Sequence, residues 1–434
     1  MVEQFKCISV IGLGYIGLPT AAVFASRKIQ VIGVDVNSIA VQTINRGEIH
    51  IVEPDLDIVV HSAVTEGYLR ATCIPEAADA FLVAVPTPFK GEHVPDLTYI
   101  EAAAKSIASV LKKGDLVVLE STSPVGTTEQ MAAWLAEARP DLSFPQQMGE
   151  DSDIRVAHCP ERVLPGHVIR ELVENDRVIG GMTARCSAAA IALYKIFVKG
   201  ECVVTDVRTA EMCKLTENAF RDVNIAFANE LSLICDKLNV NVWELITLAN
   251  RHPRVNILQP GPGVGGHCIA VDPWFIVHKT PQDAKLIHAA RLVNDRKPKW
   301  VIEKIDAAVQ DFISKNPGKT AATVMVACFG LAFKPNIDDL RESPALEITL
   351  ELAKKFSGQI IAVEPNIDIL PPSLAEAGVI LAPMGVAIER SDILVLLVDH
   401  DLFKNRPLNE FEGKFVIDTR GIWQKGERQR MLVN

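Results

Sequence analysis

The stretch from Lys6 to Asp35 constrains the fold of this 434-residue chain more than any other part of it. A short apolar run to Ile11 leads into the glycine-rich segment GLGYIG (12–17), a helical pattern and a second apolar run that ends at Asp35. Glycines at these spacings give a tight turn, let a phosphate approach the backbone and pack helix against strand; the helix N-terminus favours negative charge. The order of elements therefore predicts a dinucleotide-binding Rossmann unit.

The residue at the end of the second run indicates which dinucleotide binds. Asp35 stands eighteen residues after Gly17, where a carboxylate accepts hydrogen bonds from the hydroxyls of an adenosine ribose. No Arg or Lys stands beside Asp35 to pair with a 2′-phosphate, so NAD is expected rather than NADP. A glycine turn without a ligand is the alternative, and the strand–helix–strand context favours a NAD site at Gly12, Gly14, Gly17 and Asp35.

Three further apolar runs end in polar residues, as expected for parallel strands. They are Asp79–Val85, Asp115–Glu120 and Arg155–Cys159. Ligands of such sheets bind beyond the carboxyl ends of the strands. This predicts one crevice surrounded by the polar side chains of Thr87, Thr122, Thr128, Glu161 and Arg162. For any one of them alone, capping of a turn or helix is the simpler explanation.

The middle of the chain reads as helix. Thr209–Leu238 holds no glycine or proline in thirty residues, about 45 Å as an α-helix. Lys214, Asn218 and Arg221 stand at i, i+4 and i+7, on one face. A solvated polar face is the usual meaning of such a triplet; the apolar character of most other positions favours a central helix with a functional cluster. Long central helices commonly pair with a twin in a dimer.

Two more helices and a boundary complete the predicted organisation. Val242–Asn250 and Asp283–Lys315 read as helices, the second interrupted at Pro298, and Asn316–Lys319 (NPGK) reads as a boundary. The expected fold class is α/β, with two Rossmann-like doubly wound domains joined by a central helical domain that has one long helix. The expected domains are 1–206, 207–315 and 316–434.

The second α/β pattern departs from the dinucleotide motif. Its first turn reads GLAFKP (330–335), which lacks the second and third glycines. Lys334, Arg341 and Arg420 stand near successive strand ends, and cations there favour a different phosphorylated ligand. Surface solvation would explain any one of these cations alone.

Cys268 lies in Pro260–Phe275, directly behind a glycine pair at 265 and 266. Its thiol is a nucleophile, a metal ligand or packing. No CxxC occurs and no second ligand cluster lies nearby, so no metal is expected. A thiol becomes useful when an aldehyde formed by NAD is oxidised again: the thiolate adds to the carbonyl, a second hydride leaves, and water hydrolyses the thioester. Lys214 and Asn218 would then stabilise the oxyanion, and Glu161 would activate the water.

Composition excludes several classes of partner. The net charge of −10 argues against nucleic acid. The longest apolar runs, such as Ile393–Val398, are too short to span a bilayer, so no membrane insertion is expected. Nine cysteines and an N-terminus without a secretion pattern favour reduced thiols in the cytoplasm.

Seven segments together carry a resemblance to a known family. GLGYIGLP, VPTPF, ESTSPVGTT, PERVLPG, AEMCKLTENAFRDVN, GVGGHCIAVDPWF and GLAFKPNIDDLRESP occur in this order over nearly the whole chain. They resemble the nucleotide-sugar 6-dehydrogenase family. The resemblance implies an N-terminal NAD-binding Rossmann domain, a central dimerising helix, a C-terminal UDP-binding domain and a two-step oxidation of a sugar C6 alcohol to a carboxylate.

The flanks of Cys268 bear on the sugar. The UDP-glucose branch of the family usually carries Ser before the cysteine and a Lys-Asp pair after it, whereas His267 precedes Cys268 here and AVDPW (270–274) follows. The resemblance therefore implies a UDP-N-acetyl-hexosamine, with UDP-N-acetylmannosamine favoured, as used for enterobacterial common antigen; the PERVLPG run points the same way. UDP-GlcNAc, UDP-GalNAc and UDP-glucose are the alternatives.

The same resemblance implies residue roles. Cys268 is the nucleophile and Lys214 the proton donor and acceptor, while Asn218, Glu161, Thr122 and Asp272 assist. NAD contacts Tyr15, Ile16, Asp35, Thr87, Thr128 and Arg341. The sugar nucleotide contacts Arg162, Val163, Lys214, Asn218, Arg221, Gly265, Phe333, Lys334 and Arg420. His252 and Arg254 complete the neighbouring site of a homodimer.

Two other classes of protein would share part of this pattern. A single-step hydroxyacid dehydrogenase also pairs a Rossmann domain with a helix-borne Lys and Asn, but it forms one NADH per substrate and needs no thiol. A non-catalytic sensor of NAD or of a sugar nucleotide would not need Lys214, Asn218 and Cys268 together.

Overall fold

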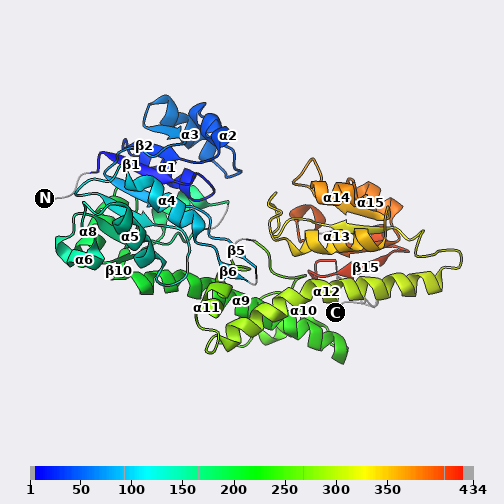
Figure 1. Cartoon of the computed structure of the whole chain (residues 1–434). Helices are drawn as coiled ribbons and strands as arrows, with labels where there is room; N and C mark the ends of the chain where they lie inside the picture. Colours follow the sequence, from blue (N-terminus) through cyan, green and yellow to red (C-terminus); the bar gives the residue numbers. More distant parts are fainter. Residues whose placement is uncertain (1–4, 92, 164–165, 267, 405, 424–434) are drawn as a thin grey trace. The chain divides into compact units, whose positions relative to one another are not determined.

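The computed structural model describes residues 5–423 apart from 92, 164–165, 267 and 405 (Figure 1). It divides into two compact units, one up to Glu217 and one from Asn218 on, and the division falls within one long helix, α9 (Val207–Leu238). In the part of the chain that the structure describes, no helix is both long and apolar enough to cross a bilayer. The predicted three-domain division stays a prediction.

The first unit is built on an eight-stranded sheet with the strand order β10-β9-β8-β7-β4-β1-β2-β3. Its pairs are parallel except for β8 with β9, which are antiparallel. Its strands are β1 (Cys7–Ile11), β2 (Gln30–Val34), β3 (Leu69–Thr72), β4 (Ala80–Val83), β7 (Leu116–Leu119), β8 (Arg155–His158), β9 (Arg177–Gly181) and β10 (Cys202–Asp206), and a separate small hairpin joins β5 (Phe89–Lys90) to β6 (Val94–Pro95).

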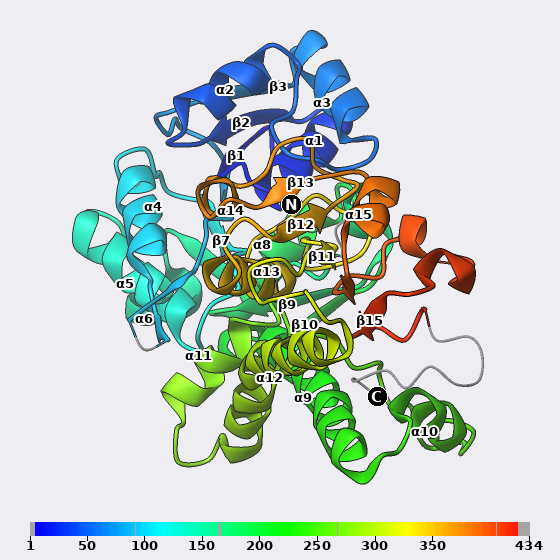
Figure 2. The same ribbon diagram turned by 90° about the vertical axis from the view of Figure 1, so that its right-hand side faces the viewer.

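Helices cover both faces of this sheet. Along β7, Leu116 and Val118 pack into one apolar cluster and Val117 and Leu119 into another, because successive side chains of a strand point to opposite faces. The first cluster contains residues of α1 (Gly17–Ser26), α3 (Leu56–Thr65), α7 (Val168–Glu174) and α8 (Ala184–Tyr194), and the second contains residues of α4 (Thr98–Ala108) and α5 (Thr127–Ala138). The shorter α2 (Ser38–Asn45) and α6 (Pro145–Met148) complete the unit, whose helices can be followed in Figure 2.

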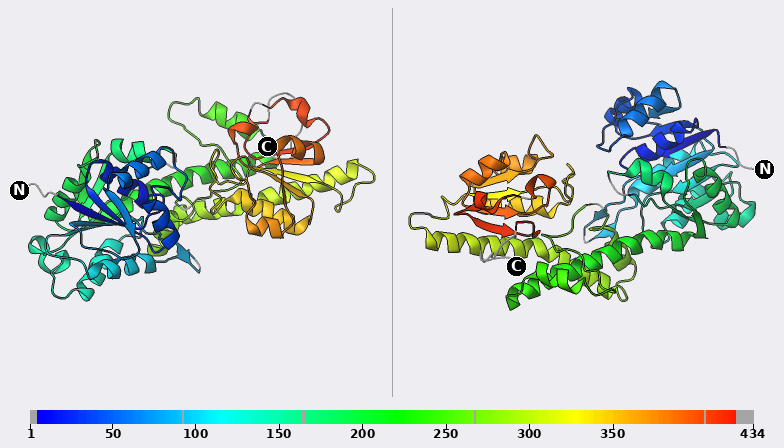
Figure 3. Two further views of the ribbon diagram at one scale, coloured as in Figure 1. Left: turned by 90° about the horizontal axis from the view of Figure 1, so that it is seen from above. Right: turned by 180° about the vertical axis from the view of Figure 1, so that it is seen from behind.

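The second unit combines helices with a five-stranded parallel sheet, β13-β12-β11-β14-β15. Its strands are β11 (Val326–Phe329), β12 (Ile360–Val363), β13 (Ile380–Leu381), β14 (Ile393–Leu396) and β15 (Phe415–Asp418). Its helices, besides the greater part of α9, are α10 (Val242–Ala249), α11 (Asp272–Lys279), α12 (Lys285–Lys315), α13 (Pro344–Lys355), α14 (Pro372–Glu376) and α15 (Met384–Arg390) (Figure 3). The predicted α/β class with two doubly wound sheets and one long helix is confirmed.

The predicted interruption at Pro298 is wrong, because α12 runs unbroken through it. A proline inside a helix loses the hydrogen bond to the carbonyl four residues before it, here Asn294. Pro298 is buried, and a Cβ on Gly263 would lie 3.1 Å from its Cγ. The packing of α12 along its length therefore offsets the lost bond.

Candidate active site

The turn after β1 has the shape that a dinucleotide requires. Gly12 has a φ of +92°, and a Cβ there would lie 2.7 Å from the carbonyl oxygen of Ala84. A Cβ on Gly17 would overlap the carbonyl of Gly12, so helix and turn approach as closely as predicted. A Cβ on Gly14 would meet nothing within 4 Å, and Gly14 is exposed. The space above Gly14 is open to a phosphate.

Asp35 is held in place at the end of β2. Its Oδ2 accepts a hydrogen bond from the Leu13 amide at 2.8 Å, and its Oδ1 accepts one from the Asn37 amide at 2.8 Å. The carboxylate is half-buried, beside a turn that leaves room for a pyrophosphate. Together these residues fit NAD.

The ends of the neighbouring strands β4 and β7 are joined by side-chain hydrogen bonds. The Thr87 hydroxyl donates to the carbonyl of Thr122, and the Ser121 hydroxyl donates to the carbonyl of Val85 at 2.7 Å. Since β1, β4, β7 and β8 are neighbours in the sheet, the structure brings Thr87 and Thr122 to the edge that carries the glycine turn. The sequence predicted this because both residues follow the carboxyl ends of expected parallel strands.

Thr128 has a partner that the sequence did not reveal. Its amide and hydroxyl donate to Oε1 of Glu211 at 2.8 and 2.7 Å, and the Gly126 amide donates to Oε2 at 2.6 Å. Thr128 and Glu211 are both buried, and burial raises the pKa of Glu211. Glu211 stands three residues before Lys214 on α9, so it fixes the first turns of that helix. The predicted contact of Thr128 with NAD stays a prediction.

Glu161 is committed to a buried ion pair. Its Oε2 lies 2.5 Å from Nη1 of Arg177, and its Oε1 accepts a hydrogen bond from the Arg162 amide at 2.7 Å. Each oxygen therefore has a protein partner, and the predicted role of Glu161 as a base for water stays a prediction. Behind this pair, Tyr194 donates to Glu120 at 2.7 Å, and burial together with the charge of Glu161 raises the pKa of Glu120 to about 7.

The Arg162 side chain turns toward α9. Its Nη2 lies 2.7 Å from Oε1 of Glu217, and its carbonyl accepts a hydrogen bond from Asn175 at 3.3 Å. Val163 packs against the core of the unit. Leu164 and Pro165, the rest of this predicted segment, lie outside the described residues. Arg162 thus reaches the helix that carries Lys214.

Cys268 lies exposed in the turn that precedes α11. The Cys268 carbonyl accepts hydrogen bonds from the amides of Val271 and Asp272, at 3.1 and 2.8 Å. The buried Asp272 carboxylate accepts one from Nδ2 of Asn218 at 2.5 Å. Hydrogen bonds therefore connect three predicted residues: Cys268 in the turn before α11, Asp272 at the start of α11, and Asn218 on α9. Arg221 is exposed on the same helix, and His267 lies outside the described residues.

The glycines before the thiol pack closely against the segment that follows β11. A Cβ on Gly265 would lie 2.8 Å from Cβ of Phe333 and from Cδ of Pro344. Gly266 has a φ of +83°, and a Cβ there would lie 2.9 Å from the Phe333 ring. The 333–344 segment therefore occupies the space that side chains at 265 and 266 would need. Contact of the Gly265 backbone with substrate stays a prediction.

Two predicted substrate residues share a small cavity of about 30 Å³ in the second unit. Phe333 and Arg420 line it together with Gly263 and Asp399. Nη2 of Arg420 lies 2.7 Å from Oδ1 of Asp399, which orients the guanidinium. The last strand end, the 330–335 turn and the glycine loop before Cys268 therefore meet at one place.

The remaining predicted cations differ in their surroundings. Lys334 is half-buried next to Phe333. Arg341 is paired with Asp339 at 2.6 Å. His252 and Arg254 are exposed in the segment after α10, where the Arg254 amide donates to Nδ1 of His252 at 3.3 Å. Their predicted contacts stay predictions.

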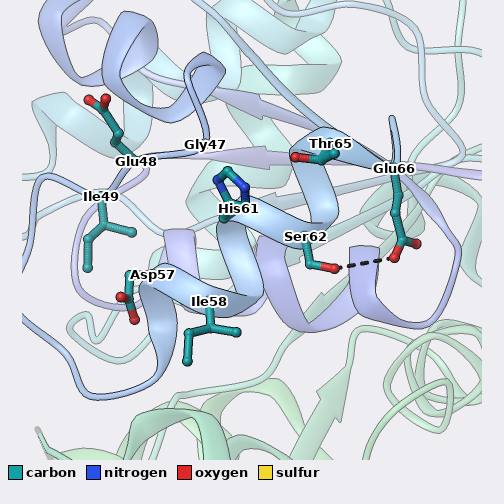
Figure 4. Close-up of a pocket in the computed structure, with 9 residues that line it drawn as sticks. All are labelled: Gly47, Glu48, Ile49, Asp57, Ile58, His61, Ser62, Thr65 and Glu66. Atoms are coloured by element: carbon teal, nitrogen blue, oxygen red, sulfur yellow. Dashed lines mark hydrogen bonds between the residues drawn. The ribbon is translucent and has the colours of Figure 1, made fainter.

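A pocket of about 740 Å³ in the first unit is lined by none of these residues (Figure 4). It is formed by α3 and the loop that follows α2, and three of its nine lining residues are the acids Glu48, Asp57 and Glu66. None of those nine is a Lys or Arg, so an anionic nucleotide is not expected there. Among the described residues, no group of three or more His, Cys, Asp or Glu side chains is arranged to hold a metal ion.

The fold and these sites define a NAD-dependent dehydrogenase with a second, differently built Rossmann-like unit. Three models of the UDP-glucose/GDP-mannose dehydrogenase family match the chain: the NAD binding domain at residues 6–198, the central domain at 208–296 and the UDP binding domain at 327–425. The chain belongs to this family.

Individual relatives are similar over nearly the full length. UDP-N-acetyl-D-mannosamine dehydrogenase of Yersinia pestis is 68% identical, over 97% of this chain and 100% of the relative. NDP-N-acetyl-D-galactosaminuronic acid dehydrogenase of Ralstonia solanacearum is 66% identical, over 97% of each. The structure of UDP-D-ManNAc dehydrogenase from Pyrococcus horikoshii superposes with a TM-score of 0.85 at 37% identity, covering 98% of this chain and 97% of that one.

Proposed function

We propose that this chain oxidises the C6 alcohol of UDP-N-acetyl-D-mannosamine to the carboxylate in two NAD-dependent steps. The relatives from Yersinia pestis and Escherichia coli and the structurally similar Pyrococcus enzyme are all named for this sugar nucleotide, which supports the substrate. All nine cysteines lie in the described part of the chain and none of them forms a disulfide there, which supports a reaction in the reducing cytoplasm.

The observation that carries the proposal is the exposed thiol of Cys268 in a turn that the Asn218–Asp272 hydrogen bond ties to α9. Oxidation of an alcohol to an aldehyde needs no thiol, whereas a thiol is useful for the second oxidation, to the acid level, because it holds the aldehyde as a covalent thiohemiacetal. The Cys268 carbonyl and the helix that follows the turn are both held by hydrogen bonds. A nucleophile fixed in this way suits covalent catalysis.

The chain's own residues divide the chemistry as follows. NAD, when bound at Gly14 and Asp35, accepts a hydride in each of the two oxidations. Lys214 takes the proton of the C6 hydroxyl in the first oxidation. The Cys268 thiolate then attacks the aldehyde carbon, and Lys214 and Asn218 stabilise the oxyanion of the thiohemiacetal. Loss of the second hydride converts the thiohemiacetal into a thioester. Water then attacks the thioester carbonyl, and the thiolate leaves as the acid forms.

The sugar nucleotide would be held by cations and one aromatic ring. Arg420, oriented by Asp399, and Lys334 supply positive charge for the diphosphate, and Phe333 supplies an apolar surface. Arg162 and Arg221 supply further positive charge beside Lys214 and Asn218 on α9.

We propose a homodimer through α9. Phe220, Phe227 and Ile234 are exposed at i, i+7 and i+14 along the helix, and such a stripe suits a second helix. His252 and Arg254, exposed after α10, would complete the neighbouring site. Sedimentation should give a dimer, and Phe227→Glu should give monomers; a monomeric wild-type protein would contradict the proposal.

The decisive test is the number of NADH formed per UDP-sugar. We expect two, and Cys268→Ala should abolish formation of the acid. One NADH per sugar, or full acid formation in the variant, would instead indicate a single-step dehydrogenase. No turnover of any UDP-sugar would indicate a binding protein.

The Ralstonia relative favours a second candidate substrate, because its identity of 66% is close to the 68% of the Yersinia relative. That substrate is UDP-N-acetylgalactosamine. Initial rates with UDP-ManNAc, UDP-GalNAc, UDP-GlcNAc and UDP-glucose, followed by NADH absorbance, distinguish them. UDP-ManNAc should have the highest kcat/KM of the four. A higher kcat/KM with another UDP-sugar would make that sugar nucleotide the proposed substrate instead.

A further inference from the structure

Four buried polar side chains form a network between α9 and α12. Nη1 of Arg291 lies 2.5 Å from Oδ1 of Asp222. Nδ2 of Asn294 donates to the same oxygen at 2.8 Å, and Nδ2 of Asn229 donates to Oδ1 of Asn294 at 2.9 Å. Each of the four is at most 2% exposed. Arg291 also pairs with Asp295, one turn further along α12.

This network holds the cysteine loop on both sides of the thiol. The Gly261 amide, seven residues before Cys268, donates to Oδ1 of Asn229 at 2.9 Å. The carbonyl of Ile269, directly after Cys268, accepts from Nη1 of Arg291 at 3.4 Å. Two members of the network thus anchor the loop: Asn229 at its start, and Arg291 beside the nucleophile.

A buried network is not needed to join two helices. Replacing a buried ion pair by well-packed apolar residues is often neutral or stabilising. Such a pair therefore contributes less to stability than to specifying one arrangement of the helices that it joins. Along α9, Asn218 binds Asp272, Asp222 binds Arg291, and Asn229 binds Gly261. These three contacts fix the register of α9 against α11, α12 and the start of the loop before Cys268.

We propose that the Asp222–Arg291–Asn294–Asn229 network positions Cys268 for attack on the aldehyde. The four side chains are positioning residues, since they act through the backbone at Gly261 and Ile269. This inference rests on the proposed thiol chemistry. A loop held less tightly leaves the thiol misplaced, and a displacement of about 1 Å at a reacting atom lowers a rate roughly 100-fold.

The test compares two variants of α9 in the full-length protein. Asn229→Ala removes the acceptor of the Gly261 amide. The matched control Ser232→Ala lies one turn along α9 and is also buried. It removes a hydrogen bond from Lys297 of α12 and one to the Asn229 carbonyl, and neither reaches the loop. Both variants should lower the thermal midpoint. Asn229→Ala alone should lower kcat about 10- to 100-fold with KM changed less than about 3-fold, and should change the rate at which iodoacetamide alkylates Cys268, followed by mass spectrometry of its peptide.

Two further measurements complete the design. Asn229→Asp keeps an acceptor for the Gly261 amide and should recover part of the lost kcat. If Asn229→Ala does not fold, Asn294→Ala takes its place, because it removes the acceptor that orients the Asn229 side chain. Equal kcat and equal Cys268 alkylation in the Asn229 and Ser232 variants would overturn the proposal, as would an Asn229 effect on KM alone. Full acid formation by Cys268→Ala would refute the proposed function instead, because alkylation reports the position of the thiol without substrate.

Discussion

Gly12 and Gly330 occupy the same place in the two sheets of the chain. Gly12 follows β1 and has a φ of +92°, and Gly330 follows β11 and has a φ of +93°. A Cβ on Gly12 would press on the Ala84 backbone, and one on Gly330 would overlap Val398, each at the end of the adjacent strand. The backbone of the turn is therefore the same in both units and is set by packing.

The likeness extends to an acid at the end of the next strand. The amide after each glycine donates to this acid: Leu13 to Asp35 at 2.8 Å, and Leu331 to Glu364 at 2.7 Å. Asp35 is half-buried, whereas Glu364 is buried and also accepts from the amide of Ala332. The first acid remains accessible to a ligand and the second is used by the protein.

The two units differ in what occupies the space of the pyrophosphate. Gly14 leaves that space open. At the corresponding position of the second unit, Ala332 has a methyl side chain that is buried. His400 adds to the closure: its Nδ1 accepts the Asn336 amide at 2.9 Å, so its Nε2 carries the hydrogen and donates to Glu364 at 3.0 Å. The turn after Gly12 therefore has room for NAD, whereas the corresponding turn of the second unit is closed by hydrogen bonds that involve a carboxylate and a histidine.

The largest effect is expected from removing the buried acid. Glu364→Ala leaves two buried amides and His400 without their acceptor, which should lower the free energy of unfolding by roughly 3–5 kcal/mol. Urea denaturation measures this loss, and the exposed Glu376→Ala should change stability by less than about 0.5 kcal/mol. An equally small loss in Glu364→Ala would show that the two acids do not differ in role.

The converse change concerns the accessible acid. Asp35→Ala should weaken NAD binding about 10- to 100-fold, because a hydrogen bond to a charged group contributes roughly 1.5–3 kcal/mol. Titration calorimetry with NAD measures the loss, with Glu376→Ala again as the control. Unchanged affinity would mean that Asp35 only caps its turn, as Glu364 does.

A smaller, reciprocal effect is expected at the second turn position. Gly14→Ala should change stability by less than about 0.5 kcal/mol, since its methyl meets no protein atom, while weakening NAD binding roughly 10-fold. Ala332→Gly should do the opposite, lowering stability by about 1 kcal/mol without affecting NAD. Melting curves with and without NAD separate the two effects. A stability loss in Gly14→Ala equal to that in Ala332→Gly would contradict the comparison.

These differences show what the sequence could predict. The GLGYIG and GLAFKP turns are local patterns, so their strands, their helices and their different ligands followed from residue order. Their positions after the carboxyl ends of expected parallel strands likewise predicted that Thr87 and Thr122 lie at one edge of the sheet. The continuity of α12 through Pro298 did not follow, because it depends on packing against Gly263.

The partners of the functional residues were not predictable for a related physical reason. Glu211 and Asp222 lie on the same helix as Lys214 and look like members of a solvated polar face. Their real partners, the amides around Thr128 and the guanidinium of Arg291, are 83 and 69 residues away in the chain. Glu161 illustrates the same limit, since only the fold reveals its pairing with Arg177.

The buried acid of the second unit also predicts a response to pH. Burial alone would raise the pKa of Glu364, but the hydrogen bonds from His400 and the Leu331 amide together lower it below its ordinary 4.5. A carboxyl whose pKa is lowered by folding contributes stability that is fully present above pH 4.5 and is lost as the pH falls through the folded value. The Leu331 and Ala332 amides should therefore lose hydrogen-exchange protection below pH 4.5, after correction for intrinsic exchange. Glu364→Gln should remove this dependence, and a dependence that persists in the variant would place the titrating group elsewhere.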